Sequence, residues 1–99
     1  MICRQWRGLA RKDRAQDYEE HLLRETLPAL KKIDGFIDAS ILIRKLKTGV
    51  EFLVETRWAS LDAIATFAGS DVEAAVVPSN IQQMMIEYDR RVKHYEVVR

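Results

Sequence analysis

The side chains in this sequence that suit acid–base chemistry are a histidine near the end of the chain and two arginines near its start. His94 lies in the segment RVKHYEVV, and Arg4 and Arg7 lie in MICRQWRG. A histidine titrates near neutral pH and can accept a proton, and a guanidinium can stabilise an oxyanion. Four aromatic side chains could stack on a ring-shaped ligand, namely Trp6, Trp58, Phe67 and Tyr95.

Each of these residues also has a purely structural interpretation. His94 could be a hydrogen-bonded histidine on a strand at an interface. Arg4 and Arg7 could form ion pairs with acids such as Glu96. Trp58 ends a predicted strand just before a helix, which is typical of a core position. The sequence leaves both interpretations open.

Motifs for other chemistries are weak or missing. His94 and Glu96 share one strand face, but two ligands do not complete a metal site, and the spacing indicates no third. No serine or cysteine stands beside a base in a nucleophile motif, and no glycine-rich segment is typical of phosphate, flavin or nicotinamide binding. We therefore predict neither a metal nor a bound cofactor.

Length and charge limit the classes of protein to which the chain can belong. Its 99 residues suffice for one domain over residues 1–99, with 47% hydrophobic and 31% charged residues. The net charge of +1 gives no long-range attraction to nucleic acid or to an anionic membrane, so we expect neither partner. The single Cys3 cannot form a disulfide within the chain, and no apolar stretch is long enough to cross a bilayer. These features predict a cytoplasmic protein.

Hydrophobic periodicity predicts six elements in the order βαββαβ. Strand patterns occur in four segments: MICRQWRGLA, FIDASILIRKL, VEFLVETRW and RVKHYEVV. Helical spacing occurs over residues 14–32 and in SLDAIATFA, and we expect IQQMMIEY to continue this second helical region. The order is the split βαβ arrangement. It predicts an α+β, ferredoxin-like fold, with a four-stranded antiparallel sheet and the helices on one face.

Local signals mark the ends of the predicted helices. Asp13 with Gln16 three positions later fits an N-cap and its reciprocal partner. Pro28 lacks an amide proton, so the first helix should kink or restart near it. Ser60 is a suitable N-cap for the second helix, and Gly69 a suitable end.

One face of the predicted sheet has no helix to cover it. Phe36, Leu42 and Leu53 point to this face if the strands alternate regularly. Exposing such side chains costs about 1.5–3 kcal/mol each relative to burial. We therefore predict a homodimer with two-fold symmetry, packed sheet against sheet, whose register charges such as Glu51 and Arg57 could set. A monomer with scattered apolar surface residues is the alternative.

Several segments resemble the antibiotic biosynthesis monooxygenase domain family, namely MICRQWRG, LPALKKIDGF, VEFLVETRWASLDAIATFAGSDVEAAVVP and YDRRVKHYEVV. The resemblance covers nearly the whole chain. It implies a dimeric α/β-barrel built of ferredoxin-like protomers. The family includes cofactor-free oxygenases of hydroquinones and anthrones, haem-degrading enzymes, and proteins with no assigned reaction.

The resemblance argues against haem degradation by this chain. Haem-degrading relatives use an asparagine late in the first strand, a tryptophan in the helix after the third strand, and a histidine one segment later. This chain has Arg7 at or beside the asparagine, Phe67 at the tryptophan and Val77 at the histidine. Valine has no lone pair for iron, and phenylalanine has no indole N–H. Residues 57–78 are therefore predicted to form an apolar pocket wall or lid.

The resemblance implies a monooxygenase that acts without a bound cofactor on a phenolic or quinol-like substrate. Such a reaction needs an apolar pocket, a base and a donor for the developing oxyanion. We assign the catalytic roles to His94 and Arg7. The predicted pocket for a small aromatic molecule consists of Arg4, Trp6, Trp58, Phe67, Val77 and Tyr95. A non-catalytic ligand-binding or structural dimer of the same fold is the alternative.

Overall fold

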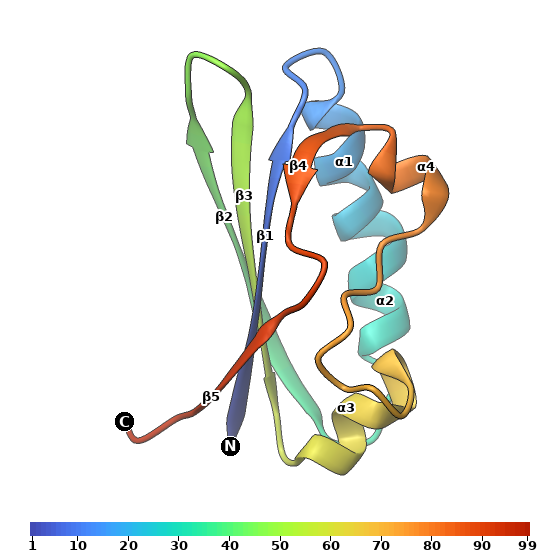
Figure 1. Cartoon of the computed structure of the whole chain (residues 1–99). Coiled ribbons are helices and arrows are strands. Elements are labelled where there is room, and N and C mark those ends of the chain that lie inside the picture. Colours follow the sequence, from blue (N-terminus) through green and yellow to red (C-terminus); the bar gives the residue numbers. More distant parts are fainter.

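The computed structural model describes all residues 1–99 and has an antiparallel sheet on one side and helices on the other (Figure 1). The strands are β1 (Ile2–Ala10), β2 (Phe36–Lys45), β3 (Val50–Trp58), β4 (Met85–Tyr88) and β5 (Lys93–Glu96). The helices are α1 (Ala15–His21), α2 (Leu27–Leu30), α3 (Leu61–Ala68) and α4 (Ser79–Gln82), with a π-helical turn η1 (Leu22–Thr26) between α1 and α2. None of these helices is long and apolar enough to cross a membrane.

The sheet has the strand order β2-β3-β1-β4, and β5 also pairs with β1. The predicted α+β, ferredoxin-like arrangement with helices on one face is confirmed. The fourth sheet position is shared, because β4 pairs with residues 8–10 of β1 and β5 with residues 2–5. The sheet therefore has five strands where the sequence predicted four.

The segment IQQMMIEY does not continue as a helix. Helix α4 ends at Gln82, and Met85–Tyr88 forms strand β4. The edge of β1 explains this, since its backbone groups at residues 8–10 need partners and β4 supplies them. After β4 the chain leaves the ladder at Asp89, whose N–H donates to the Arg7 carbonyl (2.9 Å). The Asp89 carboxylate accepts from the Arg7 N–H (3.0 Å), so a side chain fills the gap between β4 and β5.

The first helix is interrupted before Pro28, as predicted. Because Pro28 has no N–H, the Arg24 carbonyl has no ordinary helical partner, and the chain forms η1 just before it. The Leu27 N–H donates to the Leu22 carbonyl, five residues back. The predicted Asp13 cap is wrong, since α1 begins after Arg14 and has no side-chain cap.

Helix α3 begins and ends as predicted. The Ala63 N–H donates to Ser60 Oγ at 3.2 Å, which satisfies one of the free amides of the first turn. Gly69 ends the helix with a φ of 88°, a conformation in which side chains other than hydrogen are strained.

The core lies between the sheet and the helices in two clusters. The larger one includes Trp6, Tyr18 and Phe52, and the smaller one consists of Leu30, Trp58 and Ile64. Burying each such side chain stabilises the fold by about 1.5–3 kcal/mol. The hydrophobic faces of β1, β3 and the helices thus meet in these two clusters.

Phe36 belongs to this core and not to the uncovered face, which corrects the prediction. A bulge between Phe36 and Asp38 shifts the alternation of β2, so that Phe36 lies opposite Trp58 on the helix side. Their ring centroids are 5.2 Å apart. Phe36 therefore adds nothing to the apolar surface of the uncovered face.

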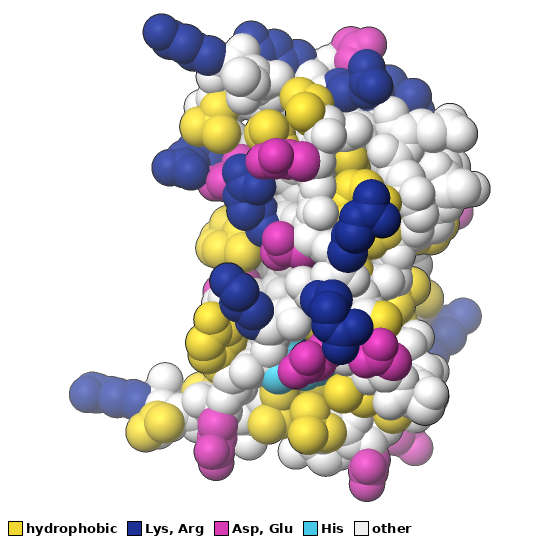
Figure 2. Space-filling model, in the orientation of Figure 1, with side chains coloured by type: hydrophobic (Ala, Val, Ile, Leu, Met, Phe, Trp, Pro, Cys, Tyr) yellow, Lys and Arg dark blue, Asp and Glu magenta, His cyan; other side chains and the backbone are white.

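The face of the sheet away from the helices, here the open face, is dominated by ion pairs within the chain. Arg7 pairs with Glu51 (2.6 Å), and Arg44 pairs with the same carboxylate (2.9 Å). Arg57 pairs with Asp38. Figure 2, which views the sheet nearly edge-on as in Figure 1, shows positive and negative side chains interleaved with hydrophobic ones and no large area of one sign.

Candidate functional site

A cavity of about 140 Å³ lies between the helix-facing side of the sheet and the covering segments. Fifteen residues line it, and ten of them are hydrophobic: Trp6, Tyr18, Leu22, Leu30, Val54, Phe67, Val76, Val77, Ile81 and Val92. The remaining five are Arg4, His21, Thr26, Thr56 and Pro78. Such a mostly apolar pocket with few polar groups is typical of a small-molecule site.

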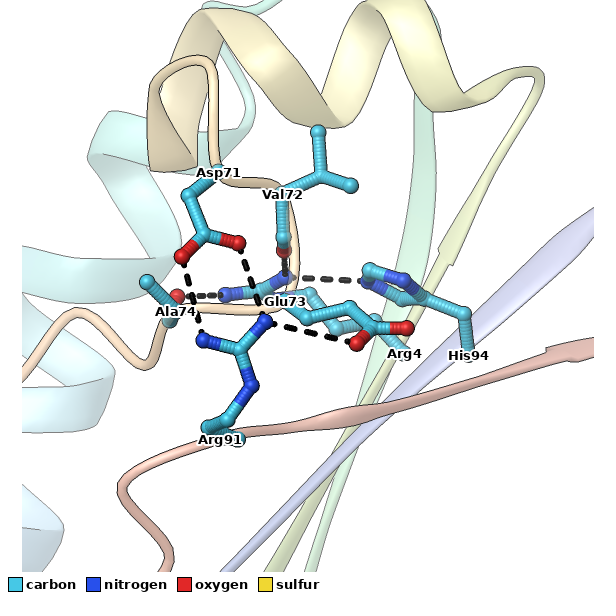
Figure 3. A network of polar contacts seen from close by, with 7 residues as sticks. All are labelled: Arg4, Asp71, Val72, Glu73, Ala74, Arg91 and His94. Atoms are coloured by element: carbon cyan, nitrogen blue, oxygen red, sulfur yellow. Dashed lines mark hydrogen bonds and ion pairs between the residues drawn. The ribbon is translucent and has the colours of Figure 1, made fainter.

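Arg4 brings a buried positive charge to this cavity. Its side chain extends from β1 on the helix side, and only 5% of the residue is exposed. As Figure 3 shows, Nη1 donates to the Val72 carbonyl and to His94 Nε2 (2.9 Å), and Nη2 donates to the Ala74 carbonyl (3.0 Å). None of the ion pairs of the chain involves Arg4. Burial lowers the pKa of Arg4 to about 10.

The Nε–H of Arg4 has no hydrogen-bond partner within the chain. All the hydrogen bonds of this guanidinium are made by its two terminal nitrogens. Every side-chain nitrogen sealed from solvent has a hydrogen-bond partner, so the unpartnered Nε must keep contact with solvent-accessible space. The guanidinium carbon also lies 5.7 Å from the centre of the Phe67 ring, which fixes its position further.

His94 lies behind Arg4 and does not line the cavity. Its Nε2 accepts a hydrogen bond from Arg4, so the ring is the neutral tautomer with its proton on Nδ1. Burial is the main cause that lowers the pKa of His94, and the charge of Arg4 lowers it further. His94 thus holds the guanidinium in place.

Residues 70–78, here the cover loop, join α3 to α4 and close one side of the cavity. Arg91 binds both carboxylate oxygens of Asp71 at 3.0 Å and reaches Glu73 at 3.4 Å (Figure 3). Backbone hydrogen bonds from Ala75 to the Arg90 carbonyl (3.0 Å) and from Val92 to the Glu73 carbonyl (2.8 Å) extend this pairing. The cover loop is therefore attached both to Arg4 and to the segment that precedes β5.

His21 is a cavity residue that the sequence analysis did not select. It projects from α1, and its Nδ1 lies 2.7 Å from a carboxylate oxygen of Glu25, one turn later. The Tyr18 ring stacks on it, with ring centroids 6.4 Å apart and an interplanar angle of 17°. Burial raises the pKa of Tyr18, so this phenol stays protonated at neutral pH. The spacing of Tyr18, His21 and Glu25 along one helix face was a readable signal.

The structure brings four of the predicted pocket residues together at the cavity: Arg4, Trp6, Phe67 and Val77. Trp58 lies beneath them. It is fully buried, stacks on Phe67 with centroids 6.2 Å apart, and donates to Thr56 Oγ1 at 2.8 Å.

Arg7 and Tyr95 lie away from the cavity. Arg7 is on the open face, whereas His94 pairs with Arg4 on the helix side, so Arg7 and His94 do not share a site. Tyr95 follows His94 on the same strand and therefore points to the open face, where it is 50% exposed.

Comparison with known proteins identifies the family of this chain. Residues 1–77 match the family described as antibiotic biosynthesis monooxygenase, or ABM. The chain belongs to the ABM family. No curated protein matches this ABM chain.

Several solved structures, two of them of ABM-type proteins, have the same fold. One is a candidate antibiotic biosynthesis monooxygenase from Bacillus cereus, with 22% identity and a TM-score of 0.67, covering 99% of this chain and 91% of that one. Another, from Deinococcus radiodurans, has 16% identity and a TM-score of 0.68, covering 100% and 94%. A third is the haem degrader MhuD from Mycobacterium tuberculosis with two haems in its active site, with 18% identity, a TM-score of 0.58, and coverage of 97% and 95%.

Two features of the cavity of this ABM chain, its volume and the valine on its wall, bear on haem binding. A cavity of about 150 Å³ holds a molecule the size of benzene. The present cavity of about 140 Å³ is of that size, whereas haem is a macrocycle of four pyrrole rings. Val77 lies on the cavity wall and offers iron no lone pair. No three His, Cys, Asp or Glu side chains gather as a set of metal ligands.

Proposed function

We propose that this ABM protein is a monooxygenase that acts, without a bound cofactor, on a phenolic or quinol-like molecule. The observation that supports this most directly is Arg4, a buried guanidinium without a carboxylate partner at the edge of an apolar cavity. An isolated charge is costly to bury, and a ligand anion would compensate it. A phenolate combines such an anion with a ring that suits apolar walls.

The cavity volume indicates the size of the substrate. A cavity of about 140 Å³ matches one aromatic ring with small substituents better than a fused tricyclic anthrone. Trp6 and Phe67 on the cavity wall can contact the faces or edges of that ring. We therefore expect monocyclic phenols and hydroquinones to be better substrates than polycyclic ones.

The proposed reaction uses dioxygen as the oxidant. The phenol loses its O–H proton, and the phenolate gives one electron to dioxygen, forming a phenoxyl radical and superoxide. These combine at a ring carbon that carries hydrogen, and loss of water from the resulting hydroperoxide leaves a quinone. A 1,4-dihydroxybenzene and one dioxygen thus give a hydroxyquinone and one water. The Arg4 Nε–H would stabilise the phenolate oxygen.

Oxygen consumption tests this function. A panel of hydroquinones, phenols and anthrones would be assayed with an oxygen electrode, and the quinone product would be identified by mass spectrometry with ¹⁸O₂. We expect turnover of one-ring substrates and incorporation of one ¹⁸O atom. A ligand that raises the melting temperature but is recovered unchanged would favour a non-catalytic binding protein instead. A shifted absorption band on adding haem would contradict the size argument.

We also propose that two copies of the chain pair through the open face. Leu42 is 48% exposed there, next to the half-buried Leu53, and Tyr95 is 50% exposed. The ion pairs of Arg7, Arg44 and Arg57 surround this apolar centre and could orient a second copy. Sedimentation at micromolar concentration should give twice the mass of 11.5 kDa. Leu42→Lys should shift the equilibrium to monomer, and a wild-type protein that sediments only as a monomer would contradict the pairing.

A further inference from the structure

The cavity is lined by a single imidazole, and it comes from the helical wall. His21 on α1 lines the cavity, while Arg4 lines it from the sheet. The other histidine of the chain, His94, has its Nε2 occupied by the hydrogen bond to Arg4. His21 is therefore the only histidine that can reach a ligand in the cavity.

The contacts of His21 fix which of its nitrogens can accept a proton. Its Nδ1 lies 2.7 Å from a Glu25 carboxylate oxygen. Because a carboxylate oxygen accepts hydrogen bonds, Nδ1 must carry the proton of this contact. In the neutral ring the lone pair is then on Nε2, and no side chain or backbone group of the protein bonds to that atom. Stacking on Tyr18 at 6.4 Å holds the ring plane. This is the arrangement of a base oriented by a carboxylate.

We propose that His21 is the base that removes the phenolic proton of the substrate, and that Glu25 is its positioning residue. The assignment rests on the proposed function. The substrate O–H bond breaks, its proton moves to His21 Nε2, and the electron pair remains on the phenolate oxygen. The imidazolium that forms keeps its Nδ1–H bond to Glu25, and the phenolate gains the guanidinium of Arg4 as its counter-ion.

Other cavity side chains do not suit this role. Tyr18 stays protonated, because burial raises its pKa, and can only donate a hydrogen bond at neutral pH. Thr26 and Thr56 are hydroxyls, which are too weakly basic at neutral pH to take a proton from a phenol. Arg4 is a cation and has no acceptor atom. A substrate with one hydroxyl would thus lie between a proton acceptor on α1 and an anion-stabilising group on β1.

A spectroscopic probe tests the proton transfer without oxygen chemistry. The probe 4-nitrophenol has one ring, and its phenolate absorbs at longer wavelength than the neutral phenol. We expect wild-type protein to bind it with an enriched phenolate band at a pH where the free probe is largely neutral. His21→Gln should lower the bound phenolate ratio by about tenfold, because the imidazolium that pairs with the phenolate is lost. Nitrobenzene, which has no proton to transfer, should bind both proteins equally.

Steady-state kinetics separate the base from its positioning residue. With a hydroquinone substrate, His21→Gln should lower kcat about 100-fold with little change in KM. Glu25→Gln should lower kcat about tenfold, and added imidazole should partly restore the activity of His21→Ala. Glu20→Gln is the matched control, because it removes the carboxylate of the residue that precedes His21 on α1 but leaves the Glu25 contact intact. This variant should leave kcat unchanged. Melting temperatures would verify that each variant is folded.

The outcomes distinguish the base assignment from the proposed function. If wild-type protein consumes oxygen and His21→Gln retains both its kcat and the phenolate band, His21 is not the base, although the monooxygenase function stands. If wild-type protein binds 4-nitrophenol without phenolate enrichment, the assignment is also overturned. If the phenolate band depends on His21 but no phenol is oxygenated, the proton transfer stands and the function fails.

Discussion

Strand β1 carries two arginines three residues apart, and they lie on opposite faces of the sheet in opposite electrostatic environments. Arg7, on the open face, pairs with Glu51 at 2.6 Å and with Glu87 at 3.2 Å. The hydrogen bond to Glu51 is the main cause that raises the pKa of Arg7. Arg4, on the helix side, has two carbonyls and a neutral histidine as partners, and burial lowers its pKa to about 10.

This difference shows why only one of the two arginines suits a ligand. The charge of Arg7 is already compensated within the chain and partly solvated, so an incoming anion would gain little from it. The charge of Arg4 is compensated only by dipoles, so an anion in the cavity would interact strongly with it. The same residue type therefore serves the surface at one position and a binding site at the other.

The largest effect should follow from removing the helix-side guanidinium. Arg4→Met would leave the carbonyls of Val72 and Ala74 without their donor, which should lower the free energy of unfolding by about 1–3 kcal/mol. The affinity for 4-nitrophenolate should fall about tenfold or more, since a charge-assisted hydrogen bond is lost. Urea unfolding and a binding titration would measure both. Arg4→Lys keeps the positive charge and should recover part of the affinity for 4-nitrophenolate. If Arg4→Met bound 4-nitrophenolate as tightly as wild type, the contrast between Arg4 and Arg7 would be contradicted.

A methyl group at Gly8 should disturb the packing on the helix side of the sheet almost as much as Arg4→Met does. A Cβ there would lie 2.3 Å from Cη2 of the Trp6 indole and 3.1 Å from Met85 Sδ, so the indole would have to move. Gly8→Ala should lower the free energy of unfolding by about 1–3 kcal/mol and shift the Trp6 fluorescence. Cys3→Ala, on the open face of the same strand, is the control and should have a smaller effect. Unchanged fluorescence in Gly8→Ala would show that the ring is not held as described.

Acid should weaken the helix side through His94. Its pKa is lowered in the folded protein, so the unfolded chain takes up its proton first as the pH falls below about 6.5. The stabilisation that neutral His94 contributes is therefore complete above that pH. It is lost as the pH falls toward the lowered pKa of His94 in the folded protein. The charged groups that face His94 are Arg4 and Glu73, and Glu73 opposes the shift.

Urea unfolding of wild type and His94→Gln at pH 7.5 and pH 5 would measure this contribution. Wild-type stability should fall more between the two pH values than that of the variant. The open-face carboxylate Glu51 has a lowered pKa, mainly because it accepts a hydrogen bond from Arg7. The stabilisation from this ion pair should therefore be lost only at a more acidic pH than the stabilisation from His94. If the free energy of unfolding fell equally between pH 7.5 and pH 5 in the two proteins, the role of His94 would be contradicted.

The smallest effect should come from Arg7. Because its side chain is 37% exposed, Arg7→Met should change the free energy of unfolding by about 0–1 kcal/mol, and less at high salt. Binding of 4-nitrophenolate should be the same as in wild type. Loss of that binding in Arg7→Met would instead support the catalytic role that the sequence analysis assigns to Arg7.

Much of the fold was predictable because its signals are local. Strand alternation, the N-cap at Ser60 and the break before Pro28 depend on neighbouring residues only, and the structure has all three. The misplaced Phe36 was not predictable, because one extra residue at the bulge reverses the alternation that follows. The helix-to-strand change at Met85 depends on the distant edge of β1.

The candidate site was only partly predictable for the same reason. Strict alternation alone separates Arg4 from Arg7, and His94 from Tyr95, so no single pocket on one face of the sheet could contain all four. Which member of each pair faces the helices depends on the long-range register of β1 with β5. His21 was readable as part of a helix face, but the cavity that gives it a role exists only after packing.

The departure of the chain from the sheet after β4 has a consequence for how the cavity is entered. Residues 90–92 pair with residues 73–75 of the cover loop and lead directly into β5. His94, which holds Arg4, is on that strand. Detachment of the C-terminal strand from its neighbour would therefore release the loop and free the guanidinium in one event. Access of small molecules to the cavity should therefore depend on how firmly β5 pairs with β1.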